Sequence, residues 1–199
     1  MQDQPWTRAP LVAVDLEGTG AQDKEHEAIL EVALVPLHGG SPDMAGAWQT
    51  LVNPGRPVPK RPWISPGLTD EVLADAPSPE QVGRELAPRV VGVCLVGHNV
   101  RVDWKLVHRH YPELRPTGLV DTLKLARNTG VAAPRGLGAL LDRFDLRGLV
   151  EELVPDGRSH RALWDTVGAA VSAEEPPKCA RNQGASERNR ASNKLNLEI

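Results

Sequence analysis

Cysteine is scarce in this chain, which has only Cys94 and Cys179 among 199 residues. Two cysteines exclude a disulfide-rich scaffold and a four-cysteine zinc site. The sequence also lacks any run of about 18 apolar residues, so we expect no transmembrane helix. Its first residues show no hydrophobic segment of the signal-peptide type. We therefore expect a cytoplasmic protein with no membrane partner.

The overall composition is that of a soluble globular protein, with 40% hydrophobic and 25% charged residues. The net charge of −3 gives the chain as a whole no attraction for phosphate. The distribution of charge is uneven, because residues 176–199 contain five basic and two acidic residues. We predict an N-terminal extension (1–10), one folded domain (11–175) and a basic, disordered tail (176–199).

Three strand-like apolar runs come early in the chain and are joined by short connections. They cover residues 11–14, 28–35 and 48–52. A parallel crossover needs a dozen residues or more, so we expect an antiparallel meander. A proline-rich, basic stretch follows at 54–66 and is interpreted as a surface loop.

Helical and strand-like segments alternate in the second part of the sequence. Ser78, Pro79 and Gln81 form a typical helix start, with a capping serine and a capping-box glutamine. The predicted helices cover 69–76, 78–89, 102–110, 122–127, 136–144 and 160–173, and the predicted strands cover 90–96 and 119–121. This order predicts an α/β fold in which a mixed sheet, three antiparallel strands and then parallel strands, is flanked by helices.

Asp15 and Glu17 follow four apolar residues at the end of the first strand. Residues two apart lie on the same face of a strand, so the two carboxylates share a face. The same spacing recurs among Asp23, Glu25 and Glu27, where a polar connection makes solvated charge the simpler explanation. Next to an apolar strand, a charge is costly unless it is paired or binds a metal.

Two further acids and a histidine lie in the second half of the chain. Asp103 follows Asn99 just beyond the apolar run 90–96, and Asp165 lies five residues after His160 in an otherwise apolar helix. The end of a central strand is where α/β sheets place function. Two of these residues also have ordinary explanations. Asp103 could be an acid in the first turn of a helix, and His160 could be a residue that starts one.

Taken in order, the motifs are Asp-x-Glu, Asn-x-x-x-Asp and His-x-x-x-x-Asp. This order resembles the DEDDh 3′→5′ exonucleases, the DnaQ-like family with a ribonuclease-H-like fold, which includes the proofreading subunit of bacterial replicative polymerases. The resemblance extends over residues 11–170 and includes Asn53-Pro54, Leu68-Thr69 and the segments 121–127 and 137–144.

The resemblance implies that Asp15, Glu17, Asp103 and Asp165 bind metal and that His160 is the general base, which makes all five catalytic. Simple electrostatics agrees, because four carboxylates in one pocket raise one another's pKa unless cations are bound. Ligands that are all oxygen favour Mg²⁺ or Mn²⁺, and two such ions can clamp the attacking and leaving oxygens of a phosphodiester.

The resemblance also implies a set of residues that contact the substrate. These are Leu16, Gly18, Thr19, Leu68, His98, Asn99 and Arg161. Gly18 stands where the family often has threonine, and Val102 where phenylalanine is common; both differences bear on substrate preference. Trp63 is a candidate for stacking on a base, with packing as the alternative, and Arg158 joins Arg161 as a candidate phosphate contact.

We therefore expect a metal-dependent exonuclease that releases nucleoside 5′-monophosphates from DNA 3′ ends in proofreading or repair, with a DNA polymerase as a candidate partner. One alternative is an RNA 3′→5′ exonuclease of the same fold, because sugar selection depends on the pocket around the 2′ position. Another is a non-catalytic nucleic-acid-binding or polymerase-scaffold module. All five residues that the resemblance makes catalytic are present, which argues against a non-catalytic module.

Overall fold

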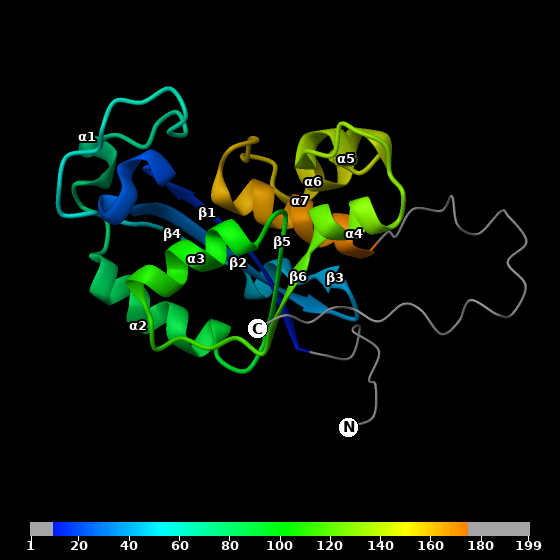
Figure 1. The fold of residues 1–199 in the computed structure, drawn as a ribbon, viewed down its shortest axis with the longest axis horizontal. Coiled ribbons are helices and arrows are strands. Elements are labelled where there is room, and N and C mark those ends of the chain that lie inside the picture. The colour runs from blue at the N-terminus through cyan, green and yellow to red at the C-terminus, as the bar shows by residue number, and fades with distance from the viewer. Residues whose placement is uncertain (1–9, 175–199) are drawn as a thin grey trace, which may run out of the picture.

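The computed structural model describes residues 10–174, which form one mixed sheet with helices packed on both faces (Figure 1). The predicted N-terminal extension, apart from Pro10, and the predicted basic tail lie outside the described residues. Across residues 10–174, no helix combines the length and the apolar character needed to cross a membrane.

The sheet has six strands, in the order β3-β2-β1-β5-β6, with β4 also paired to β2. Strand β1 pairs antiparallel with β2 and parallel with β5, which in turn pairs parallel with β6. The predicted meander followed by parallel strands is therefore confirmed. The strands are β1 (Leu11–Gly18), β2 (Ile29–His38), β3 (Ser41–Pro42), β4 (Trp48–Leu51), β5 (Cys94–Gly97) and β6 (Gly118–Asp121).

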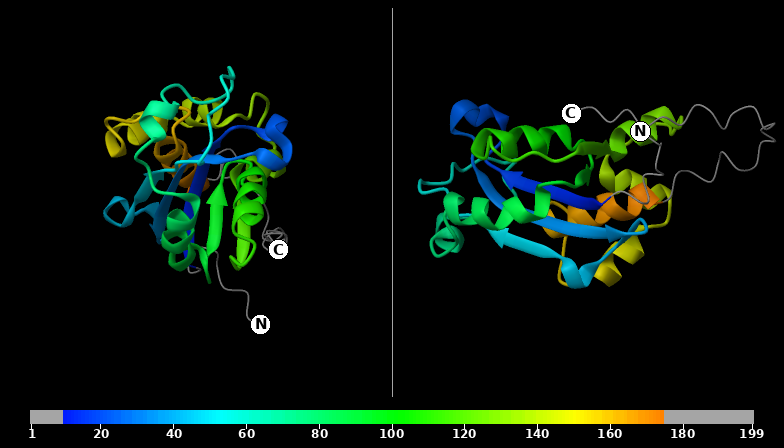
Figure 2. Two further views of the ribbon diagram at one scale, coloured as in Figure 1. Left: turned by 90° about the vertical axis from the view of Figure 1, so that its left-hand side faces the viewer. Right: turned by 90° about the horizontal axis from the view of Figure 1, so that it is seen from below.

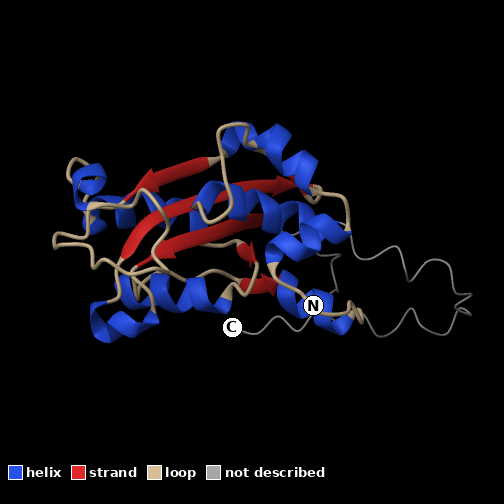
Figure 3. Cartoon of the chain, turned by 90° about the horizontal axis from the view of Figure 1, so that it is seen from above, coloured by secondary structure: helices blue, strands red, loops and turns tan. Residues whose placement is uncertain are grey.

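Helices cover the two faces of the sheet unequally (Figure 2). Helices α2 and α3 pack on one face, whereas α7 packs on the other and contacts α5 and α6. Figure 3 shows helices on both sides of the strands. The helices are η2 (Ala21–His26), η3 (Met44–Gly46), α1 (Asp70–Leu73), α2 (Pro79–Val90), α3 (Arg101–His110), α4 (Thr122–Asn128), α5 (Leu137–Arg143), α6 (Arg147–Leu153) and α7 (Ala162–Glu174).

Alternation along β1 divides its side chains between the two faces. Leu11 and Ala13 belong to the core beneath α7, whereas Val12 and Val14 belong to the core beneath α2 and α3. A strand has a side-chain period of two, so positions 15 and 17 continue the row that faces α7. The core thus determines which way the two acids after the apolar run are directed.

Two predicted boundaries are wrong. The apolar run 90–96 is not one strand, because Val90 ends α2, Gly92 turns the chain at a φ of +81°, and β5 begins at Cys94. Buried helix ends and buried strands are equally apolar, so periodicity could not separate them. The predicted last helix includes His160, but this residue precedes α7, which begins at Ala162. Helix α6 and the two-residue strand β3 were not predicted.

Candidate active site

The end of β1 extends beyond its parallel neighbour. Pairing of β1 with β5 runs from Leu11 to Ala13, whereas pairing with β2 continues to Gly18. The chain leaves β5 close to β1, since a Cβ on Gly97 would lie 2.9 Å from the Val14 carbonyl oxygen. This brings the start of α3 to the uncovered edge of β1, where the Leu16 N–H donates a hydrogen bond to the Asp103 carboxylate.

Helix α7 supplies an acid from the opposite side. Val167 and Ala170 pack in the core that contains Ala13. The Thr166 hydroxyl lies 3.4 Å from the Ala33 carbonyl oxygen of β2, so the neighbouring Asp165 lies close to the sheet. As a result, one carboxylate oxygen each from Asp15, Glu17 and Asp165 lies within 4.8 Å of the others. We call these three residues and the adjacent Asp103 the carboxylate cluster. Residues of β1, α3 and α7, up to 150 positions apart in the sequence, thus lie close together.

The four acids oppose one another's ionisation. Burial, together with the charges of Asp103, Asp165 and Glu17, raises the pKa of Asp15 well above its usual value. Burial raises the pKa of Asp103 to about 7, against hydrogen bonds from its own backbone N–H and that of Leu16. Burial and the charge of Glu17 raise the pKa of Asp165 to about 6. Burial also raises the pKa of Glu17, although Ser65 donates a hydrogen bond to it.

The raised pKa values of the four carboxyl groups bear on whether the cluster can bind a cation. Positive charge bound among half-buried carboxylates held this close together would favour their ionised form at neutral pH. Their oxygens are hard ligands of the kind that Mg²⁺ and Mn²⁺ prefer. Asp15, Glu17 and Asp165 are placed to share an ion, and Asp103 is next to them. The donor set therefore fits the divalent metals expected from the sequence.

His160 is exposed and lies beside the cluster. In its protonated form it would lower the pKa of both Glu17 and Asp165, which places its ring near these two carboxylates. Its backbone N–H donates a 3.0 Å hydrogen bond to Oδ2 of Asp165. The residue has a φ of +64°, in the left-handed region that a residue with a Cβ rarely adopts. An exposed imidazole beside carboxylates is suited to accept a proton near neutral pH.

Two residues that touch the site were not singled out from the sequence. Ser65 is buried and its hydroxyl donates to Glu17, so the proline-rich loop reaches the cluster. Glu31 is buried on β2 opposite Glu17 and forms an ion pair with Arg161. A charge inside the apolar run 28–35 was a usable signal for Glu31. The contact of Ser65 joins positions 48 residues apart, and nothing in its local sequence indicates it.

The predicted substrate-binding residues near β1 are held by the strand connection. The Thr19 hydroxyl accepts a 2.9 Å hydrogen bond from the Ala28 N–H, and its side chain is buried. Leu16 packs at the border of the core beneath α3. Leu68 is buried and packs with Leu30 and Leu73. Gly18 lies where the pairing of β1 with β2 shifts register.

The other predicted contacts follow β5 or precede α7. Asn99 has a φ of +65° and its N–H donates to Asp121 Oδ1 at 3.0 Å. His98 Nδ1 lies 3.0 Å from the Thr122 hydroxyl, and burial lowers the pKa of its imidazole. Arg161 directs two guanidinium nitrogens at Glu31. Whether these residues bind substrate stays a prediction.

The loop 54–68 carries two further candidates. Trp63 is 46% exposed, and its indole N–H donates a 3.1 Å hydrogen bond to the Thr19 carbonyl at the end of β1. Arg158 donates to the Pro66 carbonyl at 2.8 Å, which links this loop to the segment before His160. Trp63 is therefore fixed at the end of β1 with an accessible ring, and Arg158 joins the two segments that flank the cluster.

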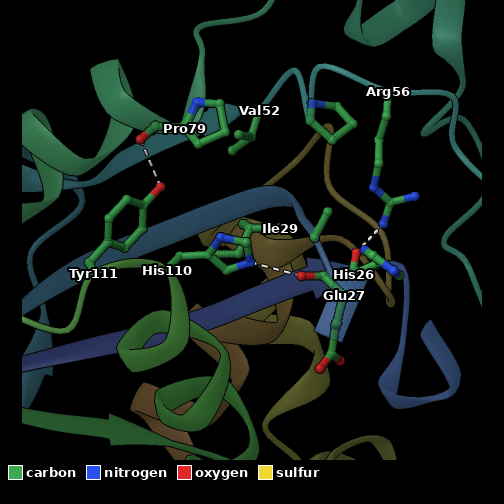
Figure 4. A pocket seen from close by; sticks show the side chains of 10 residues that line it. His26, Glu27, Ile29, Val52, Arg56, Pro79, His110 and Tyr111 are labelled. Atoms are coloured by element: carbon green, nitrogen blue, oxygen red, sulfur yellow. Dashed lines mark hydrogen bonds between the residues drawn. The ribbon is translucent and has the colours of Figure 1, made fainter. Parts of the chain in front are cut away.

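A separate hollow of about 200 Å³ lies between the start of β2 and the end of α3 (Figure 4). Its polar groups have protein partners. The Tyr111 hydroxyl donates to the Pro79 carbonyl at 2.9 Å, His110 Nε2 lies 2.8 Å from the Glu27 carbonyl oxygen, and Arg56 donates to the His26 carbonyl. The hollow includes none of the predicted site residues. These contacts link the β1–β2 connection to α3 and to the loop 54–68, and link the end of α3 to α2.

Comparison with known proteins identifies the family. The family model RNase_T, described as exonuclease, matches residues 12–170. A DNA polymerase III subunit epsilon-like protein of Rhodobacter capsulatus is 29% identical over 174 residues, which are 85% of this chain and 24% of that protein. The chain thus spans about a quarter of the length of this relative.

Solved structures agree with this assignment. Exonuclease X in complex with 5′ overhanging duplex DNA superimposes with a TM-score of 0.61 at 27% identity, covering 81% of this chain and 87% of that one. The nuclease domain of 3′hExo, a DEDDh family member bound to rAMP, superimposes with a TM-score of 0.58 at 17% identity. The match covers 83% of this chain and 90% of that one, and it supports the fold alone. The chain belongs to the exonuclease family, has a ribonuclease-H-like fold and carries a cluster of acidic residues that could hold a metal ion.

Proposed function

We propose that this chain is a divalent-metal-dependent 3′→5′ exonuclease that releases nucleoside 5′-monophosphates from DNA 3′ ends. The observation that carries the proposal is the meeting of Asp15, Glu17 and Asp165 within 4.8 Å, with Asp103 and His160 beside them. This is the full set of side chains that hydrolysis of a phosphodiester requires: ligands for cations and a base for water. A nucleic-acid phosphate would bring further negative charge, so the cluster needs cations before it can accept this substrate.

The residues divide the work between them. Asp15, Glu17, Asp103 and Asp165 would hold Mg²⁺ or Mn²⁺, two ions in our proposal, which supply charge stabilisation at the attacking and leaving oxygens. His160, exposed beside Glu17 and Asp165, accepts the proton of the attacking water. The Ser65 hydroxyl and the Leu16 N–H hold Glu17 and Asp103 in place.

The more similar of the compared proteins favour DNA over RNA as the substrate. Exonuclease X, which is 27% identical, was solved with duplex DNA, and the curated relative bears the name of a DNA polymerase subunit. The neighbour bound to rAMP is 17% identical and carries the fold alone. The same relative supports association with a DNA polymerase, which we propose as the partner.

The test is degradation of oligonucleotides labelled at the 5′ end, as 3′-mismatched DNA and as RNA of the same sequence, with Mg²⁺, Mn²⁺ or EDTA. We expect a metal-dependent ladder that shortens from the 3′ end and faster cleavage of DNA. Cleavage from the 5′ end would instead release the label at once as a mononucleotide. Faster cleavage of RNA would select the RNA exonuclease, and no cleavage by folded protein would select the non-catalytic module.

Asp15→Asn should lower the rate at least about 100-fold, because metal stabilisation of the transition state amounts to several kcal/mol and each ~1.4 kcal/mol is tenfold in rate. Asp75→Asn is the matched control, since Asp75 is exposed and outside the cluster. We expect this control to retain the wild-type rate. A comparable rate in both variants would remove Asp15 from the reaction.

A further inference from the structure

Glu31 is a buried carboxylate that the proposed reaction does not use. It is 4% exposed and lies on β2 directly opposite Glu17. Its charge adds to the repulsion within the cluster, since it raises the pKa of Asp15, Glu17 and Asp165. A fifth acid beside four others works against their ionisation. The groups that donate hydrogen bonds to Glu31 explain why a buried acid stands at this position.

Three donors converge on Glu31 from the segment that carries His160. Arg161 donates from Nε to Oε2 and from Nη2 to Oε1, both at 2.7 Å, which is two-point ion pairing. The Ala162 N–H donates to Oε2 at 3.3 Å. Arg161 follows His160 directly, and Ala162 is the first residue of α7. Glu31 therefore ties the start of α7 to the sheet one residue after His160.

His160 needs such support because of its backbone. A φ of +64° persists in a residue with a Cβ only where the surroundings hold it. Asp165 binds the His160 N–H on one side, and Glu31 fixes the next two residues on the other. We infer that the position of the exposed imidazole depends on these two anchors.

We propose that Glu31, through Arg161 and the Ala162 N–H, is a positioning residue that holds His160 in its place beside the carboxylate cluster. The inference rests on the proposed function of His160 as the base. Displacement of a reacting group by about 1 Å can lower a rate by about 100-fold. We expect Glu31→Gln, which keeps the shape but loses the charge and one acceptor oxygen, to lower kcat about 10- to 100-fold with little change in KM.

The main test is a double-mutant cycle in kcat on the DNA oligonucleotide with Mn²⁺. If Glu31 acts through His160, Glu31→Gln should cost less than about threefold once His160→Ala is present. Mn²⁺ affinity, measured by calorimetry without substrate, should stay within about threefold of wild type. An equal loss in both backgrounds, or a parallel fall in Mn²⁺ affinity, would overturn the proposal, because Glu31 would then act through the metal ligands or the fold.

Two further variants keep the test decisive. Arg161→Lys retains the charge with a single contact and should give a smaller loss of kcat, which covers the case in which Glu31→Gln fails to fold. Asp142→Asn removes a two-point ion pair on the surface, because Asp142 of α5 accepts from Nε and Nη2 of Arg147 of α6. This variant should leave kcat unchanged. Full activity of His160→Ala would overturn the proposed function of His160 itself. An inactive His160→Ala beside a fully active Glu31→Gln would overturn only the present inference.

Discussion

At the scale of single residues, Gly18 shows how close packing limits what can stand beside the site. A Cβ at this position would lie 2.9 Å from the Ala28 carbonyl oxygen and 3.2 Å from a methyl group of Leu106. The backbone oxygen cannot move away, because it accepts the Thr19 N–H at 3.0 Å. The absence of a side chain at position 18 thus lets the β1–β2 connection close over the end of β1.

Gly18→Ala should therefore destabilise the fold by about 1–3 kcal/mol, the usual effect of overpacking. The measurement is urea unfolding followed by circular dichroism. Gly148→Ala is the control, because a Cβ there meets no atom within 4 Å and the residue lies in α6. It should be neutral or stabilise by up to about 1 kcal/mol. If both variants unfold at the same urea concentration, the close approach at Gly18 has no energetic weight.

Asp15 and Asp165 could be singled out from their local sequence, because each interrupts an apolar pattern, whereas Asp103 was identified through the family resemblance. Asp15 and Asp165 stand in runs whose other members are buried, and a charge in such a place needs a partner. Glu31 obeys the same rule and could have been found. Ser65 could not, because its contact with Glu17 depends on the path of a proline-rich loop. Nor could the left-handed backbone of His160, which tertiary contacts determine.

At the scale of elements, local chemistry predicts α2 best. Ser78 Oγ accepts the Gln81 N–H at 3.4 Å, and Gln81 Oε1 accepts the Ser78 N–H at 2.8 Å, so the capping box forms as expected. Helix α6 has no such signal, because Leu146 at its N-cap offers no side-chain acceptor. A helix with a short apolar face and no cap depends on packing, and its local sequence does not identify it.

Ser78→Ala should lower the free energy of unfolding by about 0.5–2 kcal/mol, since it leaves helix N–H groups without their acceptor. Ser172→Ala makes the same chemical change inside α7, where the hydroxyl donates to the Gly168 carbonyl at 2.6 Å. Such a bond does not cap a helix end, so this control should change stability by less than about 0.5 kcal/mol. Equal losses in thermal melts of the two variants would contradict the capping role.

At the scale of the whole molecule, stability is coupled to the charge of the carboxylate cluster. The pKa of Asp103 is raised to about 7 and that of Asp165 to about 6, and those of Asp15 and Glu17 are raised as well. In the unfolded chain, these groups would titrate near pH 4. Between these values the folded protein binds more protons than the unfolded chain, so its stability falls as pH rises. A cation that binds the ionised cluster opposes this fall.

We therefore expect the melting temperature in EDTA to decrease from pH 5 to pH 8, and the increase on adding Mg²⁺ to be larger at pH 8. The scale is about 2–4 °C for each kcal/mol in a protein of this size. Asp103→Asn should melt higher than wild type in EDTA at pH 8, because it removes one of the opposed charges, and should respond less to Mg²⁺. Asp75→Asn serves as the control, because Asp75 is exposed and lies outside the cluster. The melting temperatures of Asp103→Asn and of this control could instead show the same pH dependence. Ionisation of Asp103 would then not oppose folding, and the cluster would not need a cation to remain ionised.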